Sequence, residues 1–221
     1  MKMTVNHLSQ NNSLLNQFLK EIRSVDIQKD SMRFRRNIER IGEVMAYEIS
    51  KSLSYQLEEI KTPLGVAPTS VSSEKLVVAS ILRAGLPFHN GMLNYLDKAE
   101  NAFVSAYRQF TDEAHENFDV HVEYIASPDL SGKTLLLCDP MLATGGSMEL
   151  SYEALKCKGV PEHIHIVCII ASQRAIDHII SIFPAEKTTV WVAAIDPVLN
   201  EHSYIVPGLG DAGDLAYGHK L

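Results

Sequence analysis

Apolar residues in the first 60 positions recur every three or four residues, which is the spacing of amphipathic helices. A polar cap at position 12 or 13 precedes Leu14–Ile22, whose apolar side chains fall on one helical face. A longer helix is predicted from position 30 or 31 to Leu53 on the same grounds. We therefore expect N-terminal helices over residues 1–60, ended by Thr62-Pro63.

After residue 61 the pattern changes to short, continuous apolar runs separated by amphipathic stretches. Such an alternation is typical of an α/β fold, in which a parallel sheet is covered by helices on both faces. Ligands of these sheets bind beyond the carboxyl ends of the strands. We expect a single domain over residues 1–221, with strands at 75–82, 102–107, 133–138, 163–171 and 188–194 and helices at 148–158 and 173–183.

The polar segment 109–129 does not fit this alternation. Within it, Val120, Val122 and Tyr124 are separated by His121 and Glu123, so one face is more apolar than the other. We interpret the segment as a solvent-facing β-ribbon or flap.

Composition and charge narrow the function classes. The 221 residues are 46% hydrophobic and carry a net charge of −7, which is a globular balance that disfavours nucleic acid as a partner. Cys138, Cys157 and Cys168 form no CxxC pair, which favours a reducing compartment. No apolar run reaches the roughly 18 residues of a spanning helix, and the N-terminus has no continuous signal-peptide core. We expect a cytoplasmic protein without a membrane partner.

The most informative loop follows the predicted strand at 133–138. Its sequence, Leu135 to Ser147 (LLLCDPMLATGGS), places two glycines between the hydroxyls of Thr144 and Ser147, directly before a predicted helix. Backbone N–H groups there can approach a phosphate closely, aided by the helix dipole. The loop is not a Walker motif, because no Lys follows the glycines. A strand-to-helix turn that merely needs two glycines is the alternative.

This loop resembles the phosphoribosyl-pyrophosphate (PRPP) loop of the type I phosphoribosyltransferases, in the form typical of their uracil branch. Segments 81–86 (ILRAGL), 107–108 (YR) and 204–214 (YIVPGLGDAGD) fit the same family in the same order. The resemblance runs from about Arg33 to the C-terminus. It implies a central parallel sheet flanked by helices, a β-ribbon flap and a C-terminal base-binding hood over residues 196–221.

The resemblance also implies roles for individual residues. Arg83 and Arg108 would bind the pyrophosphate of PRPP, and Asp139 would orient its ribose. Pro140 stands where the wider family has a second acidic residue, so Mg²⁺ would be held mainly through PRPP, without a direct metal site in the protein. Asp211 and Asp196 could reach this ion or its waters, and Asp211 is also a weak candidate base. The implied catalytic residues are Arg83, Arg108, Asp139 and Asp211; the implied PRPP-binding residues are these four with Pro140, Met141, Leu142, Ala143, Thr144, Gly145, Gly146 and Ser147; the implied uracil-binding residues are Ile205, Gly210, Asp211 and Ala212.

The implied activity converts uracil and PRPP to UMP and diphosphate in pyrimidine salvage. Homo-oligomers (dimers or tetramers) and activation by GTP also occur in the family, and the apolar N-terminal helices are candidate interface material. Two alternatives remain: a regulatory protein that keeps this fold and binds RNA, and a transferase for another nucleobase. His163 and His165 lie on one strand face but lack a third metal ligand, and Cys138 is expected to be a core residue.

Overall fold

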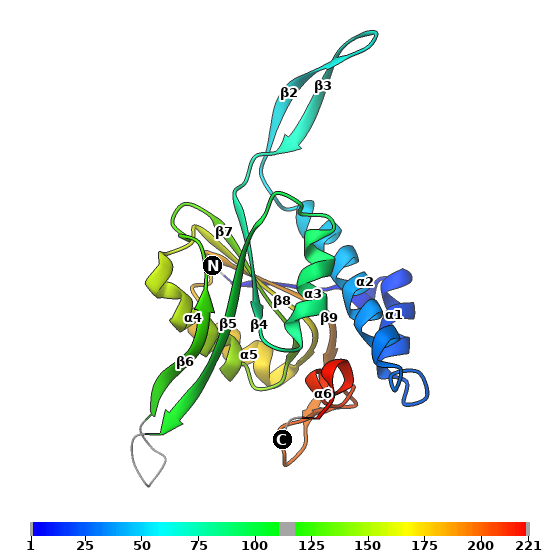
Figure 1. The fold of residues 1–221 in the computed structure, drawn as a ribbon, viewed down its shortest axis with the longest axis vertical. Coiled ribbons are helices and arrows are strands. Elements are labelled where there is room, and N and C mark those ends of the chain that lie inside the picture. The colour runs from blue at the N-terminus through cyan, green and yellow to red at the C-terminus, as the bar shows by residue number, and fades with distance from the viewer. Residues whose placement is uncertain (1, 111–117, 220–221) are drawn as a thin grey trace.

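A seven-stranded sheet forms the centre of the computed structural model, which describes residues 2–110 and 118–219, with side chains at 106–110 and 118–122 left out of the description. Every neighbouring pair of strands is parallel except β5 and β6, which are antiparallel. The predicted α/β class is confirmed. In spatial order the strands are β1 (Thr4–His7), β9 (Thr188–Asp196), β8 (His163–Ser172), β7 (Thr134–Leu142), β4 (Leu76–Ile81), β5 (Glu100–Phe110) and β6 (Phe118–Ala126) (Figure 1).

Helices cover both faces of the sheet (Figure 1). Because neighbouring residues of a strand point to opposite faces, Val78 and Leu136 pack in one core cluster and Val77 and Leu135 in the other. The first cluster contains residues of α1 (Leu14–Arg23), α2 (Ser31–Ser50), α3 (Gly85–Leu93) and α6 (Ala212–Tyr217); the second contains residues of α4 (Gly146–Leu155) and α5 (Gln173–Ile182).

The predicted caps of the first two helices are present. The Ser13 hydroxyl accepts a hydrogen bond from Leu15 N, and the Asp30 carboxylate accepts one from Arg33 N. Short 3₁₀ turns at Leu8–Gln10 and Lys156–Lys158 precede α1 and follow α4. None of the helices within residues 2–110 and 118–219 has the length and apolar character needed to cross a membrane.

The helical prediction for residues 1–60 is wrong at both ends. Thr4–His7 is the edge strand β1, and β2 (Tyr55–Thr62) and β3 (Gly65–Ser72) form an antiparallel hairpin. Thr62-Pro63 therefore begins a hairpin turn instead of ending a helix; the Thr62 hydroxyl accepts hydrogen bonds from Leu64 N and Gly65 N. The hairpin projects beyond the sheet and is exposed along both strands (Figure 1), so its sequence does not display a buried face.

The segment predicted as a ribbon, 109–129, includes β6, which pairs with β5 from Phe103↔Ala126 to Phe110↔Phe118. Residues 111–117, which lie inside the predicted flap, fall outside the described residues. The pairing agrees with a two-stranded ribbon at the sheet edge. That it closes over a ligand stays a prediction.

Candidate functional site

The candidate site lies where the carboxyl ends of β4 and β7 meet. Strand β4 pairs with β5 on one side and β7 on the other, so the chain leaves β4 and β7 in opposite directions, and α3 and α4 cover opposite faces. Open parallel sheets bind ligands at such a point. A cavity of about 310 Å³ occurs there. Nine predicted site residues line it: Arg83, Asp139, Met141, Ala143, Ser147, Ile205, Gly210, Asp211 and Ala212.

The loop from β7 to α4 has the conformation that its glycines suggested. Gly145 has φ of +88° and is the N-cap of α4, and Gly146 N donates to the Thr144 hydroxyl at 3.4 Å. An added Cβ at Gly145 would lie 2.7 Å from Cδ2 of His178, because α5 packs behind the loop. Only glycine therefore fits here, and the exposed side chains of Thr144 and Ser147 stand on either side of Gly145 and Gly146 at the start of α4.

Asp139 lies inside β7, not at its end as the sequence suggested, because β7 continues to Leu142. Burial raises the pKa of Asp139 to about 7, although a hydrogen bond from Met141 N at 3.4 Å acts in the opposite direction. The carboxyl group therefore changes charge near neutral pH in the free protein. Hydroxyl donors or a cation from a bound ligand would stabilise its ionised form.

Arg83 joins the β4 end of the cavity to the C-terminal helix. Its Nη2 lies 3.3 Å from Oδ1 of Asp214, and its Nη1 donates to the Gly218 carbonyl at 3.4 Å. The buried Nε makes no hydrogen bond with any described residue. A guanidinium that is charged, lines a cavity and keeps an unused donor is suited to bind an anionic ligand.

The C-terminal segment closes the other side of the cavity. Strands β10 (Val198–Leu199) and β11 (Ile205–Val206) form a short hairpin, and Asp211 caps α6 by accepting from Asp214 N at 2.9 Å. Ile205 and Ala212 are each 4% exposed, whereas Gly210 has φ of +94° and open space around it. This segment therefore places two buried apolar side chains, Ile205 and Ala212, beside the exposed backbone of Gly210.

The remaining predicted site residues are placed differently. Pro140 and Leu142 alternate with the cavity-lining residues of β7 and are buried, and Thr144, Gly145 and Gly146 form the loop beside the cavity without lining it. The side chain of Arg108, on β5, lies outside the described residues. The second carboxylate considered for the ion, Asp196, does not line the cavity; Arg23 and Gly208 N bind both its oxygens.

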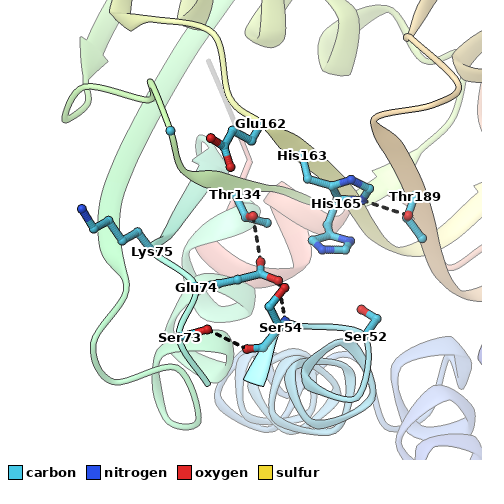
Figure 2. A pocket seen from close by; sticks show the side chains of 11 residues that line it. Ser52, Ser54, Ser73, Glu74, Lys75, Thr134, Glu162, His163, His165 and Thr189 are labelled. Atoms are coloured by element: carbon cyan, nitrogen blue, oxygen red, sulfur yellow. Dashed lines mark hydrogen bonds between the residues drawn. The ribbon is translucent and has the colours of Figure 1, made fainter. Parts of the chain in front are cut away.

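A second cavity of about 550 Å³ lies at the opposite, amino ends of the strands (Figure 2). Its polar groups are largely paired with one another. Glu74 accepts from Ser54 N at 2.6 Å and from Thr134 Oγ1 at 2.8 Å, and His163 hydrogen bonds with Thr189. His165 accepts from Trp191 Nε1, and burial lowers its pKa to about 4. Within the described part of the chain, no three His, Cys, Asp or Glu side chains are arranged to hold a metal ion.

Comparison with known proteins decides the family. A sequence profile described as uracil phosphoribosyltransferase matches residues 9–219. The chain belongs to the uracil phosphoribosyltransferase family. A relative from Porphyromonas gingivalis that carries this name is 64% identical over 219 residues, which are 99% of this chain and 100% of that protein. The predicted function and enzyme class are thereby confirmed.

Solved structures agree with the fold. The AQ2163 protein from Aquifex aeolicus superposes with a TM-score of 0.83 at 28% identity, covering 97% of this chain and 98% of that one. Orotate phosphoribosyltransferase from Mycobacterium tuberculosis, solved with PRPP, has a TM-score of 0.50 at 12% identity and shares the fold over 86% of this chain and 95% of its own. The type I phosphoribosyltransferase architecture is confirmed.

Reasoning from sequence did not find several residues around the site. Tyr204 lines the cavity, Asp214 holds Arg83, and His178 supports Gly145 from behind. Asp214 lies inside the quoted segment 204–214, so its acidic character next to a predicted anion-binding Arg was a usable signal. His178 sits on an ordinary amphipathic helix, and nothing in its local sequence distinguishes it.

Proposed function

We propose that the cavity between β4, β7 and the C-terminal segment is the active site, in which PRPP and uracil react to give UMP and diphosphate. The supporting observation is that three separate parts of the chain meet at the cavity: Arg83 after β4, the half-buried Asp139 with the phosphate-type loop that follows it, and the apolar side chains of the C-terminal segment. The opposite cavity lacks a guanidinium and a helix N-terminus among its lining groups. It fits this chemistry less well.

In this proposal PRPP lies along the β4 and β7 ends. The N–H groups at the start of α4 and the hydroxyls of Thr144 and Ser147 bind the 5′-phosphate. Asp139 accepts hydrogen bonds from the ribose hydroxyls. Arg83 and Arg108 bind the pyrophosphate, since guanidinium groups stay charged and bind phosphate oxygens in pairs.

Uracil lies against the C-terminal segment. The side chains of Ile205 and Ala212 are apolar and buried, so they can contact the face of a planar base. Backbone N–H and C=O groups near Gly210 form hydrogen bonds with the edge of the base. There is room for a ligand there, because an added Cβ at Gly210 would meet no atom within 4 Å. The base and the ribose C1 then meet in the same cavity.

The reaction breaks the bond between ribose C1 and the pyrophosphate oxygen and forms a bond between C1 and uracil N1. The electron pair of the broken bond leaves with diphosphate, and uracil loses the proton of N1. Positive charge develops on the ribose, so catalysis consists mainly of positioning and electrostatic stabilisation. Asp211, whose Oδ1 caps α6, is the candidate acceptor for the proton. The 109–129 ribbon would exclude water.

Mg²⁺ fits this site as a partner of PRPP. The cavity offers two carboxylates, Asp139 and Asp211, and no set of three ligands is present among the described residues. Mg²⁺ commonly uses one or two carboxylates together with substrate phosphates and water. When bound, the ion would neutralise charge on the pyrophosphate. Asp139 and Asp211 would contact it or its waters.

The hairpin β2–β3 supports assembly into a homo-oligomer. Leu57, Leu64 and Val66 are 70%, 100% and 62% exposed, and a lone two-stranded hairpin is marginally stable in water. The N-terminal helices stay a second candidate interface, because Leu14 of α1 and Met32 and Tyr47 of α2 are 73%, 64% and 55% exposed. Sedimentation of a variant with residues 56–71 replaced by a short Gly-Ser turn tests the assignment; an unchanged mass would contradict it.

Two further predictions, on regulation and on location, complete the proposal. GTP as an activator rests on the family resemblance, and titrating GTP against kcat/KM tests it. A cytoplasmic location is supported by three unpaired cysteines, two of them buried, and cell fractionation tests it.

The activity is tested with purified protein, Mg²⁺, PRPP and radiolabelled uracil. We expect labelled UMP. If PRPP binds in a calorimeter but no UMP forms, the enzyme proposal fails. Salt-dependent RNA binding under the same conditions would then favour the regulatory alternative. Parallel reactions with hypoxanthine and cytosine test the alternative of another nucleobase.

A further inference from the structure

A partly buried ion pair connects the C-terminal segment to α1 and to the end of β9. Asp196, the last residue of β9, accepts hydrogen bonds from both terminal nitrogens of Arg23, at 2.7 and 2.8 Å. Its Oδ2 also accepts from Gly208 N at 2.8 Å, and Arg23 Nη1 donates to the Gly208 carbonyl at 2.9 Å. One ion pair therefore holds both backbone polar groups of a single residue.

The ion pair between Arg23 and Asp196 is shielded from solvent and requires an Arg at position 23. The Asp196 side chain is 7% exposed and that of Arg23 24% exposed, so solvent screens the pair weakly. Burial tends to raise the pKa of Asp196, but the hydrogen bonds from Arg23 and Gly208 outweigh it and lower the pKa below its usual value. The planar fork of Arg matches the carboxylate in two places, which a Lys cannot do.

The backbone conformation at position 208 admits only glycine. Its φ is +56°, and an added Cβ would overlap the carbonyl oxygen of Ile205. The next residue, Leu209, is buried in the same core cluster as Ile205 and Ala212. The turn is thus fixed by an ion pair on its backbone and by an apolar side chain beside it.

The turn lies within the segment that we propose to recognise uracil. Gly208 is three residues after Ile205 and two before Gly210, both of which line the cavity. Arg23, Asp196 and Gly208 do not themselves line the cavity. Any effect of the pair on substrate must therefore pass through the position of this backbone.

We propose that Arg23 and Asp196 are positioning residues for uracil recognition, which act by fixing the backbone of Gly208 and with it the groups at Ile205 and Gly210. This inference rests on the proposed placement of uracil. In the proposed site PRPP lies mainly along the β4 and β7 ends, and neither Arg23 nor Asp196 lines the cavity there. Breaking the ion pair should therefore weaken the binding of uracil more than the binding of PRPP.

The test compares Arg23→Met, Arg23→Lys and Asp196→Asn with the wild type. Arg33→Met is the matched control, because Arg33 of α2 also forms an ion pair with α1, to Glu21 at 3.2 Å, but Gly208 hydrogen bonds with Arg23 and Asp196 instead. For each we would measure kcat, KM for uracil, the Kd of PRPP by calorimetry, and the thermal unfolding midpoint.

We expect Arg23→Met and Asp196→Asn to raise KM for uracil about tenfold or more, the effect of losing one or two charge-assisted hydrogen bonds. The Kd of PRPP should change by less than about threefold in the same variants, and Arg33→Met should match the wild type. Arg23→Lys should fall between, because it keeps the charge but loses the second branch. Since the two residues act as one unit, the double variant should be less than multiplicative.

Several results would overturn the inference. Equal weakening of uracil and PRPP, or a lowered unfolding midpoint with unchanged KM for uracil, would show a merely structural contact. If Arg23→Met does not fold, Arg23→Lys decides the question: its KM for uracil should rise by a larger factor than its Kd of PRPP. Ala212→Leu separates the two hypotheses: if it raises KM for uracil while the ion-pair variants do not, the positioning inference alone fails, and if neither changes KM, the placement of uracil fails.

Discussion

The guanidinium of Arg83, which follows β4, lies 3.3 Å from the carboxylate of Asp214 in the first turn of α6. In the proposed site this ion pair connects the residue that binds pyrophosphate to the segment that binds uracil. The side chains are 35% and 25% exposed, so the pair is partly screened. Asp214 and the pyrophosphate therefore compete for the same guanidinium.

The first prediction follows from this competition. Asp214→Asn removes the competing charge and should lower the Kd of PRPP by about two- to fivefold, the scale of a partly exposed ion pair. Calorimetric titration measures it. Glu153→Gln, which breaks an exposed pair with Lys156 outside the cavity, is the control and should leave PRPP binding unchanged. Weaker PRPP binding in Asp214→Asn would mean that Asp214 holds Arg83 in its binding position.

The second prediction concerns the phosphate loop. Gly145→Val places a branched side chain against His178 and into a positive φ, so the loop must change shape. We expect a folded protein whose Kd for PRPP rises by about 30- to 150-fold, equivalent to about 2–3 kcal/mol of lost hydrogen bonds. Calorimetry with PRPP measures it.

Gly132→Val is the matched control for this variant. Gly132 also has a positive φ, +69°, but an added Cβ meets only the Glu162 side chain at 3.9 Å, far from the proposed phosphate loop in the fold. It should carry a similar backbone cost without an effect on PRPP. Unchanged PRPP affinity in Gly145→Val would place the 5′-phosphate elsewhere.

Asp139 gives a prediction about pH. Its pKa of about 7 in the free protein means that the carboxyl is mostly protonated at pH 6 and mostly ionised at pH 8. Since ribose hydroxyls donate to the ionised form, PRPP affinity should rise by about tenfold over this interval. Asp139→Asn should lose this rise and keep only the part due to PRPP's own phosphates. Parallel slopes for the two proteins would show that Asp139 does not contact PRPP.

Ionisation of Asp139 also affects the free energy of unfolding, which should fall as the pH rises, whereas the affinity for PRPP should rise. Burial raises the folded-state pKa of Asp139 from 3.8 to about 7, so ionisation costs stability as the pH rises through this window. Asp139→Asn should therefore unfold at a higher temperature than the wild type at pH 8, by about 2–4 °C for each kcal/mol regained. The difference should vanish below about pH 4. A lower midpoint for the variant at pH 8 would mean that the ionised carboxylate is stabilised in the free protein.

The sequence predicted the parts of this molecule that local patterns encode. The buried strands are continuous apolar runs, and the loop at 144–147 has a distinctive pair of glycines, so the sequence predicts both. The β2–β3 hairpin was missed because nearly all its residues are exposed, so no alternation marks a buried face. The contact between Arg23 and Asp196 spans 173 residues, and nothing near either residue indicates the other. The position of Asp139 inside β7 depended on where the sheet ends, which is set by pairing with β8.

The final prediction concerns which base is accepted. Uracil presents acceptors at O2 and O4 and a donor at N3–H, whereas cytosine has an amino donor at C4 and an acceptor at N3. Backbone groups near Ile205, Gly210 and Ala212 cannot change their donor and acceptor pattern, because the turn at Gly208 is fixed to Asp196 and Arg23. Cytosine would leave two buried groups facing like partners, at about 1–3 kcal/mol each, so kcat/KM should fall at least tens-fold.

Ala212→Leu tests whether the base binds against Ala212. Ala212 is 4% exposed and lines the cavity, so the larger side chain should occupy the space of the base and raise KM for uracil while the Kd of PRPP stays nearly the same. Hypoxanthine should be a poor substrate for the wild type because a purine exceeds the space beside this segment. Measuring kcat/KM for uracil, cytosine and hypoxanthine in parallel decides the matter, since comparable values for uracil and either of the others would show that residues 205–212 do not select the base.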